Sequence, residues 1–227
     1  MAKKKLIRFK DMEGFPNVAQ PSMNEFWEED FELKGKWKSH FFKNNNPLVL
    51  ELACGKGEYT VNMAKKYPNK NFLGIDIKGA RIWYGASKAI EENIENAKFL
   101  RTRIDFLDKL FNEQEVDEIW ITFPDPQPQE SRERKRLTSP MFIDRYKKIL
   151  KNGGEMHLKT DADSFFDYTL QQIEENNFSI INKFTDVYHQ VDEIPEELNH
   201  LYTVKTHYEG IFSAKGHTIK YVSFKIH

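Results

Sequence analysis

Carboxylates stand at or next to the ends of short apolar runs, where they can bind a nucleoside. The run 48–52 leads into Glu51-Leu52-Ala53-Cys54-Gly55-Lys56-Gly57, and Gly55 and Gly57 let the backbone pass close to a ligand. Beside this loop the Glu51 carboxylate repels a pyrophosphate but accepts hydrogen bonds from a cationic amino-acid group. Asp76 follows about 20 residues after the loop, where an acid binds ribose hydroxyls. Together they predict a nucleoside cofactor, although each alone also fits a structural turn or a helix cap.

A third acid, Asp105, follows the apolar run 98–103 and belongs to the same carboxyl edge of the predicted sheet. Ligands of open α/β sheets bind at this edge, and a carboxylate there suits the exocyclic amine of an adenine. The alternative is that Asp105 caps the helix that follows it.

The run Phe123-Pro124-Asp125-Pro126-Gln127-Pro128 is the most informative local pattern. Prolines on both sides of Asp125 fix its backbone at the end of the apolar run 116–123. This placement indicates an acid held in an active-site loop, although turn chemistry alone also explains a Pro-Asp-Pro.

A basic run, Arg132-Glu133-Arg134-Lys135-Arg136, comes next. Most charge runs are solvated faces. Beside a candidate active-site loop, however, Arg132, Arg134 and Arg136 are placed to hold phosphates while a base enters the pocket.

The elements that position these residues alternate along the chain. Apolar runs predict strands, amphipathic patterns predict helices, and short continuous apolar strands that alternate with helices are typical of a parallel sheet. We therefore expect an α/β fold with a mostly parallel, seven-stranded sheet, helices on both faces and an antiparallel last strand. The expected strands are 48–52, 71–76, 98–103, 116–123, 154–159, 179–184 and 218–226, and the helices are 59–66, 80–95, 139–151 and 163–175.

Two segments stand outside this alternation. Residues 1–44 are expected to form an extended arm over 1–30 and a short helix over 34–44, packed on a domain formed by 45–227. The polar segment 186–206 is expected to be a functional loop or insertion before the last strand.

Six motifs in this order resemble those of bacterial tRNA (guanine-N7-)-methyltransferases, and the resemblance covers residues 45–227. They are Glu51-Leu52-x-x-Gly55-x-Gly57, Gly74-Ile75-Asp76, Phe123-Pro124-Asp125-Pro126, Arg134-Lys135-Arg136-Leu137, Leu158-Lys159-Thr160-Asp161 and Thr206-His207-Tyr208-Glu209. The resemblance implies a Rossmann-like class I methyltransferase fold and S-adenosylmethionine as cofactor. It also implies methylation of N7 of guanine 46 in the tRNA variable loop.

Site residues follow from the same resemblance. It implies cofactor contacts by the acids Glu51, Asp76, Asp105 and Asp125. It implies substrate contacts by Asp161, Thr206, Tyr208 and Glu209. The chain departs from the family at Ala53, which replaces the first loop glycine, at Gln127, which replaces a tryptophan, and at Gln129, which replaces a substrate-binding lysine.

The expected reaction fits these residue types. Guanine N7 carries a lone pair and no proton, so attack on a sulfonium methyl requires alignment and accommodation of positive charge rather than a general base. Asp125 and Asp161 are the candidate catalytic residues for this task, and a carboxylate such as Glu209 also suits the N–H donors of guanine. Lys159 could approach a phosphate or be an ordinary strand-end lysine. The seven histidines show no metal spacing, so no metal is expected.

Bulk properties bound the partners. A chain of 227 residues with 39% hydrophobic and 30% charged residues predicts one globular domain. Its single cysteine, Cys54, excludes an intrachain disulfide, and the sequence lacks an apolar run long enough for a membrane span. We expect a cytoplasmic monomer or homodimer with tRNA as partner, no membrane and no obligatory protein partner. The net charge of −1 decides nothing, because the basic residues cluster at 3–10 and 132–136.

Three alternatives remain open. A methyltransferase with a small-molecule or protein acceptor leaves the basic run 132–136 unexplained. A catalytically silent RNA-binding protein on the same fold is favoured by Gln127 and Gln129 and disfavoured by the intact acids. A nicotinamide dehydrogenase is disfavoured by the glycine spacing.

Overall fold

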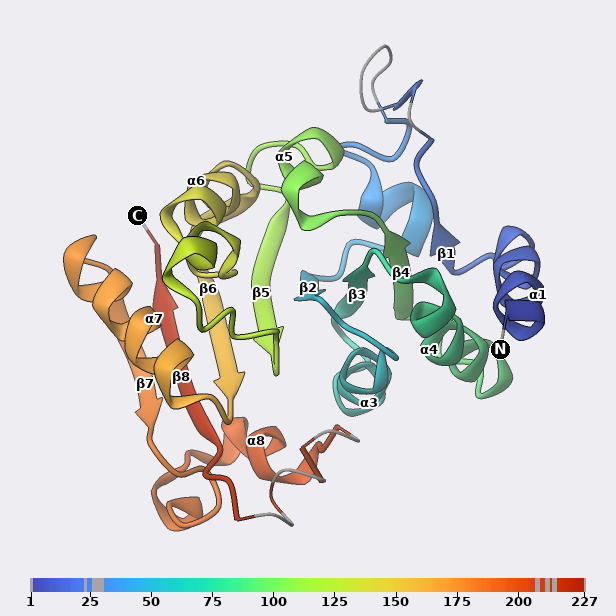
Figure 1. Ribbon diagram of the computed structural model, residues 1–227. Coiled ribbons are helices and arrows are strands. Elements are labelled where there is room, and N and C mark those ends of the chain that lie inside the picture. Colours follow the sequence, from blue (N-terminus) through green and yellow to red (C-terminus); the bar gives the residue numbers. More distant parts are fainter. Residues whose placement is uncertain are drawn as a thin grey trace.

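The apolar runs become the strands of one mixed sheet. The computed structural model describes residues 2–22, 24–25, 31–206, 209–210, 213 and 216–226, without the side chains of 2–5. Within these residues the sheet has eight strands in the order β1-β4-β3-β2-β5-β6-β8-β7 (Figure 1). They are β1 (Val18–Ala19), β2 (Leu48–Leu52), β3 (Asn71–Asp76), β4 (Ala97–Arg101), β5 (Val116–Thr122), β6 (Leu150–Thr160), β7 (Ser179–Phe184) and β8 (Lys220–Lys225).

The strand directions confirm the predicted sheet. The five strands β4, β3, β2, β5 and β6 pair in parallel, so the carboxyl ends that carry the candidate site residues share one edge. The last strand, β8, runs antiparallel between β6 and β7. The additional eighth strand, β1, pairs in parallel with β4 through only two residues, Val18 and Ala19.

Helices cover both faces of the sheet because the central strands bury their side chains in both directions. Leu50 of β2 joins the core beneath α5 (Leu107–Leu110), α6 (Pro140–Ile149) and α7 (Asp163–Glu175). Its neighbour Val49 joins the opposite core, beneath α3 (Glu58–Lys66), α4 (Gly79–Glu91) and α8 (His200–Thr203). Each fully buried aliphatic side chain of this kind contributes roughly 1.5–3 kcal/mol to folding.

The expected extended arm over residues 1–30 is wrong at its beginning, where α1 (Ala2–Glu13) is a helix. The prolines lie after this helix and do not interrupt it. The side chains of Phe9 and Met12 pack on Gly79 at the start of α4, where an added Cβ would lie 2.6 Å from the Met12 methyl carbon. The predicted short helix over 34–44 is a six-residue π-helical segment, η1 (Trp37–Phe42).

The segment 186–206 between β7 and β8 forms short helical turns. It contains the 3₁₀ turns η4 (Val191–Glu193) and η5 (Glu196–Leu198) followed by α8. Its apolar residues Val187, Ile194 and Leu201 are buried in the core on the α3 side. Among the described helices, none has the length and apolar character needed to cross a membrane.

Candidate functional site

The glycine loop and Asp76 are in direct contact at the carboxyl edge of the sheet. Asp76 Oδ2 accepts a hydrogen bond from the Gly55 N–H at 3.0 Å, and Oδ1 accepts one from the Lys78 N–H at 2.7 Å. The acid therefore shapes both the loop and the approach to α4, as well as facing the site. Gly57 has φ +70°, and an added Cβ would lie 2.4 Å from the Phe99 ring, so a side chain is excluded there.

Glu51 lies beneath the loop and is 4% exposed. Its Oε1 accepts a hydrogen bond from the Thr122 hydroxyl at 2.6 Å, and Oε2 accepts one from the Thr60 N–H at 2.8 Å as well as one from the Thr60 hydroxyl. Burial raises the pKa of Glu51 to about 7, against the lowering effect of these hydrogen bonds. The carboxyl group is thus poised between its two protonation states near neutral pH.

A cavity of about 510 Å³ opens beside Asp76 and also contains Asp105. Two carboxylates that were predicted from separate strand ends therefore line one space, with apolar walls that suit the flat base of a nucleoside. The remaining lining residues are Ala53, Ile77, Thr102, Arg103, Ile104, Arg134, Lys135, Leu137, Met141 and Phe142. Asp105 does not cap α5, because the helix has Phe106 at its N-cap and no side-chain capping bond there.

A second, smaller cavity of about 80 Å³ lies on the other side of the loop. Glu51 and Gly55 line it together with Phe123 of the Pro-Asp-Pro loop and Thr206. The cofactor loop, the loop after β5 and the start of the Thr-x-Tyr-Glu motif therefore meet at this point.

The loop that carries Asp125 is strained and braced. Phe123 and Gln127 have φ of +47° and +46°, a region that costs non-glycine residues energy. Asp125 is exposed, and its Oδ1 accepts a hydrogen bond from the Gln127 N–H at 3.2 Å. Arg136 Nε donates to the Gln127 carbonyl at 3.1 Å, while its guanidinium lies 4.4 Å from the Tyr168 ring on α7.

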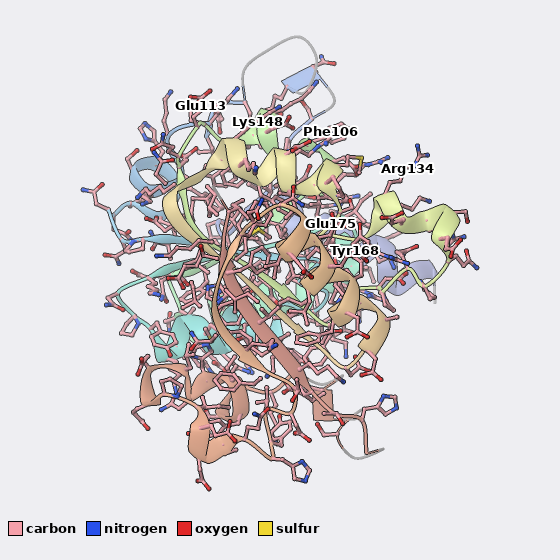
Figure 2. All side chains as sticks on the ribbon, turned by 90° about the vertical axis from the view of Figure 1, so that its left-hand side faces the viewer. Phe106, Glu113, Arg134, Lys148, Tyr168 and Glu175 are labelled. Carbon is pink, nitrogen blue, oxygen red and sulfur yellow. The ribbon has the colours of Figure 1, made fainter. Side chains whose placement is uncertain are left out.

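The three arginines of the basic run have three different environments. Arg132 and Arg134 are exposed on a 3₁₀ segment, η3 (Glu130–Lys135). Arg134 also lines the larger cavity. Figure 2 shows Arg134 at the periphery of the molecule, and it also labels Tyr168 on α7. Arg136 is half-buried against the Pro-Asp-Pro loop, so its first task is structural.

Asp161 follows β6 at the same edge of the sheet. Its side chain is 18% exposed, and Oδ2 lies 3.4 Å from His217 Nδ1. Neither Asp161 nor Asp125 lines the two cavities described above.

Thr206 and Glu209 form a reciprocal capping box. The Thr206 hydroxyl accepts a hydrogen bond from the Glu209 N–H at 3.1 Å, and Glu209 Oε2 accepts one from the Thr206 N–H at 3.3 Å. The pair holds Thr206 at the smaller cavity. Tyr208, the third predicted residue of this motif, lies outside the described residues.

Lys159 and Glu209 form an ion pair in which both side chains are 0% exposed, with Nζ 2.6 Å from Oε1. The Tyr188 hydroxyl donates a second hydrogen bond to Oε1 at 2.7 Å. Burial lowers the pKa of Lys159, and Glu209 opposes that shift. A phosphate cannot reach a lysine buried to this degree, so that expectation is wrong.

Lys159 also supports the Pro-Asp-Pro loop, a role that its sequence position does not reveal. Its backbone carbonyl accepts a hydrogen bond from the Phe123 N–H at 2.9 Å. Its ammonium lies 5.9 Å from the rings of both Phe123 and Tyr59. The signal in the sequence was a lysine near the end of a predicted strand.

The described residues contain no group of three or more His, Cys, Asp or Glu side chains that could hold a metal ion. The donors at this edge of the sheet are carboxylates, hydroxyls and backbone N–H groups. They suit a polar organic ligand with hydroxyl and amino groups.

Comparisons of the sequence with known proteins find methyltransferases. Residues 45–222 match a family described as "Putative methyltransferase". The chain is 49% identical to a tRNA (guanine-N(7)-)-methyltransferase of Christiangramia forsetii, with 99% of each chain covered. It is 45% identical to one of Bacteroides fragilis, covering 99% of this chain and 86% of that protein.

Solved structures support the fold. A 30S ribosomal A1408 methyltransferase from an uncultured bacterium superposes with a TM-score of 0.54 at 16% identity, covering 82% of this chain and 90% of that one. The 16S rRNA methyltransferase KamB gives a TM-score of 0.56 at 12% identity, with coverages of 80% and 88%.

Proposed function

The chain belongs to the tRNA (guanine-N(7)-)-methyltransferase family, and we propose that it transfers the methyl group of S-adenosylmethionine to N7 of guanine 46 in the tRNA variable loop. The observation that carries this proposal is that Asp76 and Asp105 line one cavity, while Asp76 also holds the glycine loop through the Gly55 N–H.

The two cavities together fit the parts of the cofactor, which when bound supplies a sulfonium methyl group. Each oxygen of Asp76 accepts one backbone N–H and keeps a lone pair for a ribose hydroxyl. Asp105 lines the same cavity, and we assign it to the adenine amine. Glu51 borders the smaller cavity, where a carboxylate suits the amino group of the methionine part.

The substrate side has to align guanine N7 and accept the positive charge that develops on the base. We assign this task to Asp125 and Asp161, which follow adjacent strands at the same sheet edge. In the described conformation both Glu209 oxygens are engaged within the protein. Glu209 therefore contributes to substrate binding by holding Thr206 in place.

We assign phosphate binding to the exposed arginines. Arg132 and Arg134 project from η3 beside the larger cavity, where they can hold the tRNA backbone. Arg136 keeps the Asp125 loop in shape instead.

One assay tests the proposed function. The protein is incubated with methyl-labelled S-adenosylmethionine and unmodified tRNA, and the methylated nucleotide is mapped. Label at N7 of guanine 46 is expected. Label on another nucleotide changes the target, whereas tRNA binding without label favours a catalytically silent RNA-binding protein.

A variant tests the cofactor site. Asp76→Ala is expected to weaken cofactor binding by about 1–3 kcal/mol, because ligand hydroxyls lose their acceptor. Calorimetric titration with S-adenosylmethionine measures this, with the thermal unfolding of the variant as a control for the lost Gly55 contact. An unchanged affinity would move the cofactor away from Asp76.

A further inference from the structure

The first basic cluster of the sequence, residues 3–10, is not used by the proposed function. It lies in α1, which has five basic residues (Lys3, Lys4, Lys5, Arg8 and Lys10) and two acidic ones (Asp11 and Glu13). In Figure 1 α1 lies beside α4, which begins at Gly79, three residues after Asp76. Because α4 begins near the carboxyl end of β3, α1 packs close to that edge of the sheet.

Specific contacts fix the orientation of α1 on α4. The Trp83 ring N–H donates to Asp11 Oδ2 at 3.0 Å, and Arg8 Nη2 donates to the Tyr84 hydroxyl at 2.6 Å. Met12 is 1% exposed beneath the helix. With this anchoring, Lys10 is exposed on α1.

Tyr84 connects this helix to the glycine loop. Its ring is 41% exposed, and two cations lie over it, Arg8 at 4.4 Å and Lys56 at 5.6 Å. Lys56 lies between Gly55 and Gly57 and lines the smaller cavity together with the exposed Arg81 and with Thr206. Basic and aromatic groups thus form a continuous surface from α1 to the turn at Thr206.

We propose that this surface, formed by Arg8, Lys10, Lys56, Arg81 and Tyr84, binds the phosphate backbone of the tRNA substrate and is separate from η3. Arginine and lysine side chains neutralise phosphates, and an exposed ring beside them offers a base a face to stack on. The inference rests on the proposed function, since it takes tRNA as the ligand. It places the RNA across the glycine loop, with basic contacts on both sides of the methyl-transfer site.

An anionic membrane is the competing ligand for a basic helix that exposes Leu6 and Ile7, which are 70% and 52% accessible. Phe9 and Met12, which would complete an apolar face, already pack on Gly79 of α4. A surface-bound helix needs that face for the lipid. RNA is therefore the better fit.

Three single variants of the full chain test the proposal through tRNA binding at several salt concentrations. Lys10→Ala removes charge from an exposed site, and Arg8→Ala removes charge together with an anchoring contact. Asp11→Ala also removes an anchoring contact, but it removes a negative charge instead of a positive one. Lys183→Ala, at an exposed site on the edge strand β7, is the matched surface control.

Lys10→Ala and Arg8→Ala are each expected to weaken tRNA binding by about threefold to tenfold and to reduce the salt slope by about 0.7–0.9, the value of one lost phosphate contact. Asp11→Ala is expected to bind tRNA as well as the wild type or better. Binding by Lys10→Ala and Arg8→Ala at wild-type strength and slope would overturn the proposal. Equal weakening by Arg8→Ala and Asp11→Ala would also overturn it, because α1 would then act only through its packing.

Two further measurements separate the outcomes. Loss of binding to phosphatidylserine vesicles in Lys10→Ala, with unchanged tRNA binding, would assign the surface to lipid and reject the proposal. Wild-type methylation of tRNA is measured in parallel. If the wild type binds tRNA without methylating it, the proposed function fails while the binding series still decides the role of α1.

Discussion

At the scale of single residues, the site depends on charges and backbone angles that are costly in isolation. The buried pair of Lys159 and Glu209 is stable only because each charge has the other as partner. Ala53 has φ +57° at the first position of the glycine loop, where the left-handed region disfavours any residue with a Cβ. Both features allow direct tests.

Lys159→Met is expected to lower the free energy of unfolding by about 3–5 kcal/mol, because Glu209 remains buried without a cation. Urea denaturation measures this change. The double variant Lys159→Met/Glu209→Met removes both charges and is expected to recover most of the loss. If Lys159→Met leaves the free energy of unfolding nearly unchanged, the Glu209 carboxyl group is already uncharged.

Ala53→Gly is expected to raise the free energy of unfolding by up to about 1 kcal/mol, since relief of the left-handed strain outweighs the added chain entropy of glycine. The reverse change, Gly55→Ala, is the matched control. Its φ is +57° and an added Cβ meets nothing within 4 Å, so only the backbone cost remains. Thermal denaturation of both variants should show shifts of opposite sign, and shifts of the same sign would contradict the strain.

The sequence predicted part of this residue-scale picture. Asp76 and Asp105 share a cavity because both follow parallel strands, and the strand ends could be read from apolar runs. The partners of Lys159 and Arg136 could not be read in this way. They depend on side chains that approach from distant segments, Glu209 in one case and Tyr168 in the other.

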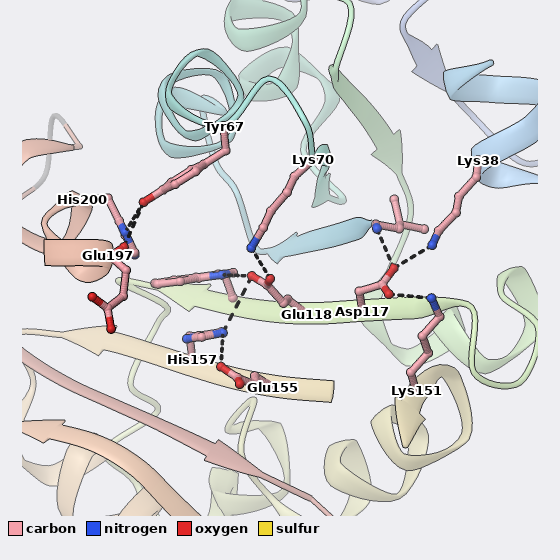
Figure 3. Close-up of polar contacts among 12 residues, drawn as sticks. Lys38, Tyr67, Lys70, Asp117, Glu118, Lys151, Glu155, His157, Glu197 and His200 are labelled. Carbon is pink, nitrogen blue, oxygen red and sulfur yellow. Dashed lines mark hydrogen bonds and ion pairs between the residues drawn. The ribbon is translucent and has the colours of Figure 1, made fainter. Parts of the chain in front are cut away.

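At the scale of elements, β5, β6 and α8 are joined by two buried histidines. His157 stacks on Trp120 at 4.0 Å, and its Nδ1 lies 2.8 Å from the Tyr221 hydroxyl. Figure 3 shows His157 between Glu118 and Glu155, and His200 beside Tyr67. Burial lowers the pKa of both histidines to about 3, so both are neutral in the folded protein at ordinary pH.

These shifts predict a pH dependence of stability. Between pH 6.5 and about 3 each histidine is protonated only when unfolded, so stability is lost as the pH falls. Glu51 acts in the opposite direction: between pH 4.5 and about 7 it keeps its proton only when folded, so its contribution is lost as the pH rises.

Urea titrations across this range should therefore separate two variants. Glu51→Gln is expected to steepen the rise of stability between pH 4.5 and 7 by about 1.4 kcal/mol per pH unit, and His157→Phe to flatten it by a similar amount between pH 3 and 6.5. Curves parallel to the wild type for both variants would mean that neither side chain is buried as described.

The element boundaries show where sequence patterns suffice. The runs 48–52 and 71–76 form strands as expected, because continuous apolar segments have few alternatives in a parallel sheet. Strand β6 begins at Leu150 rather than 154, since Leu150 pairs with Val116 of β5 before an irregularity that contains Gly153 at φ +78°. The helix α1 was missed because its stability comes from packing on α4, which local sequence does not display.

At the scale of the whole molecule, the net charge of −1 hides a strongly uneven distribution. Asp76 and Asp105 line the larger cavity together with basic residues, and the exposed Arg132 and Arg134 lie on η3. The fold class and the carboxyl-edge location of the site were predictable, because the alternation of strands and helices allows few topologies. The surface proposed to bind RNA was not predictable, since it depends on how α1 and η3 pack.

The double variant Arg132→Ala/Arg134→Ala is expected to weaken tRNA binding and reduce the salt slope by about 1.4–1.8, since two phosphate contacts are lost. Arg136→Ala serves as the contrasting variant, because it frees the Asp125 loop and should lower the methyl-transfer rate more than tRNA affinity. Filter binding across a salt series and single-turnover kinetics distinguish the two. An unaltered slope in the double variant would locate the RNA contacts elsewhere.

The position of β8 inside the sheet has a consequence for biosynthesis. Strand β7 has β8 as its only neighbour among the described strands, and β6 needs β8 to complete its second side. A nascent chain on the ribosome therefore holds two unpaired strand edges until residues 220–225 emerge, and such edges attract other chains. Premature termination before β8 would leave a product prone to aggregation, so chaperone capture during translation is most valuable for the final stretch of this polypeptide.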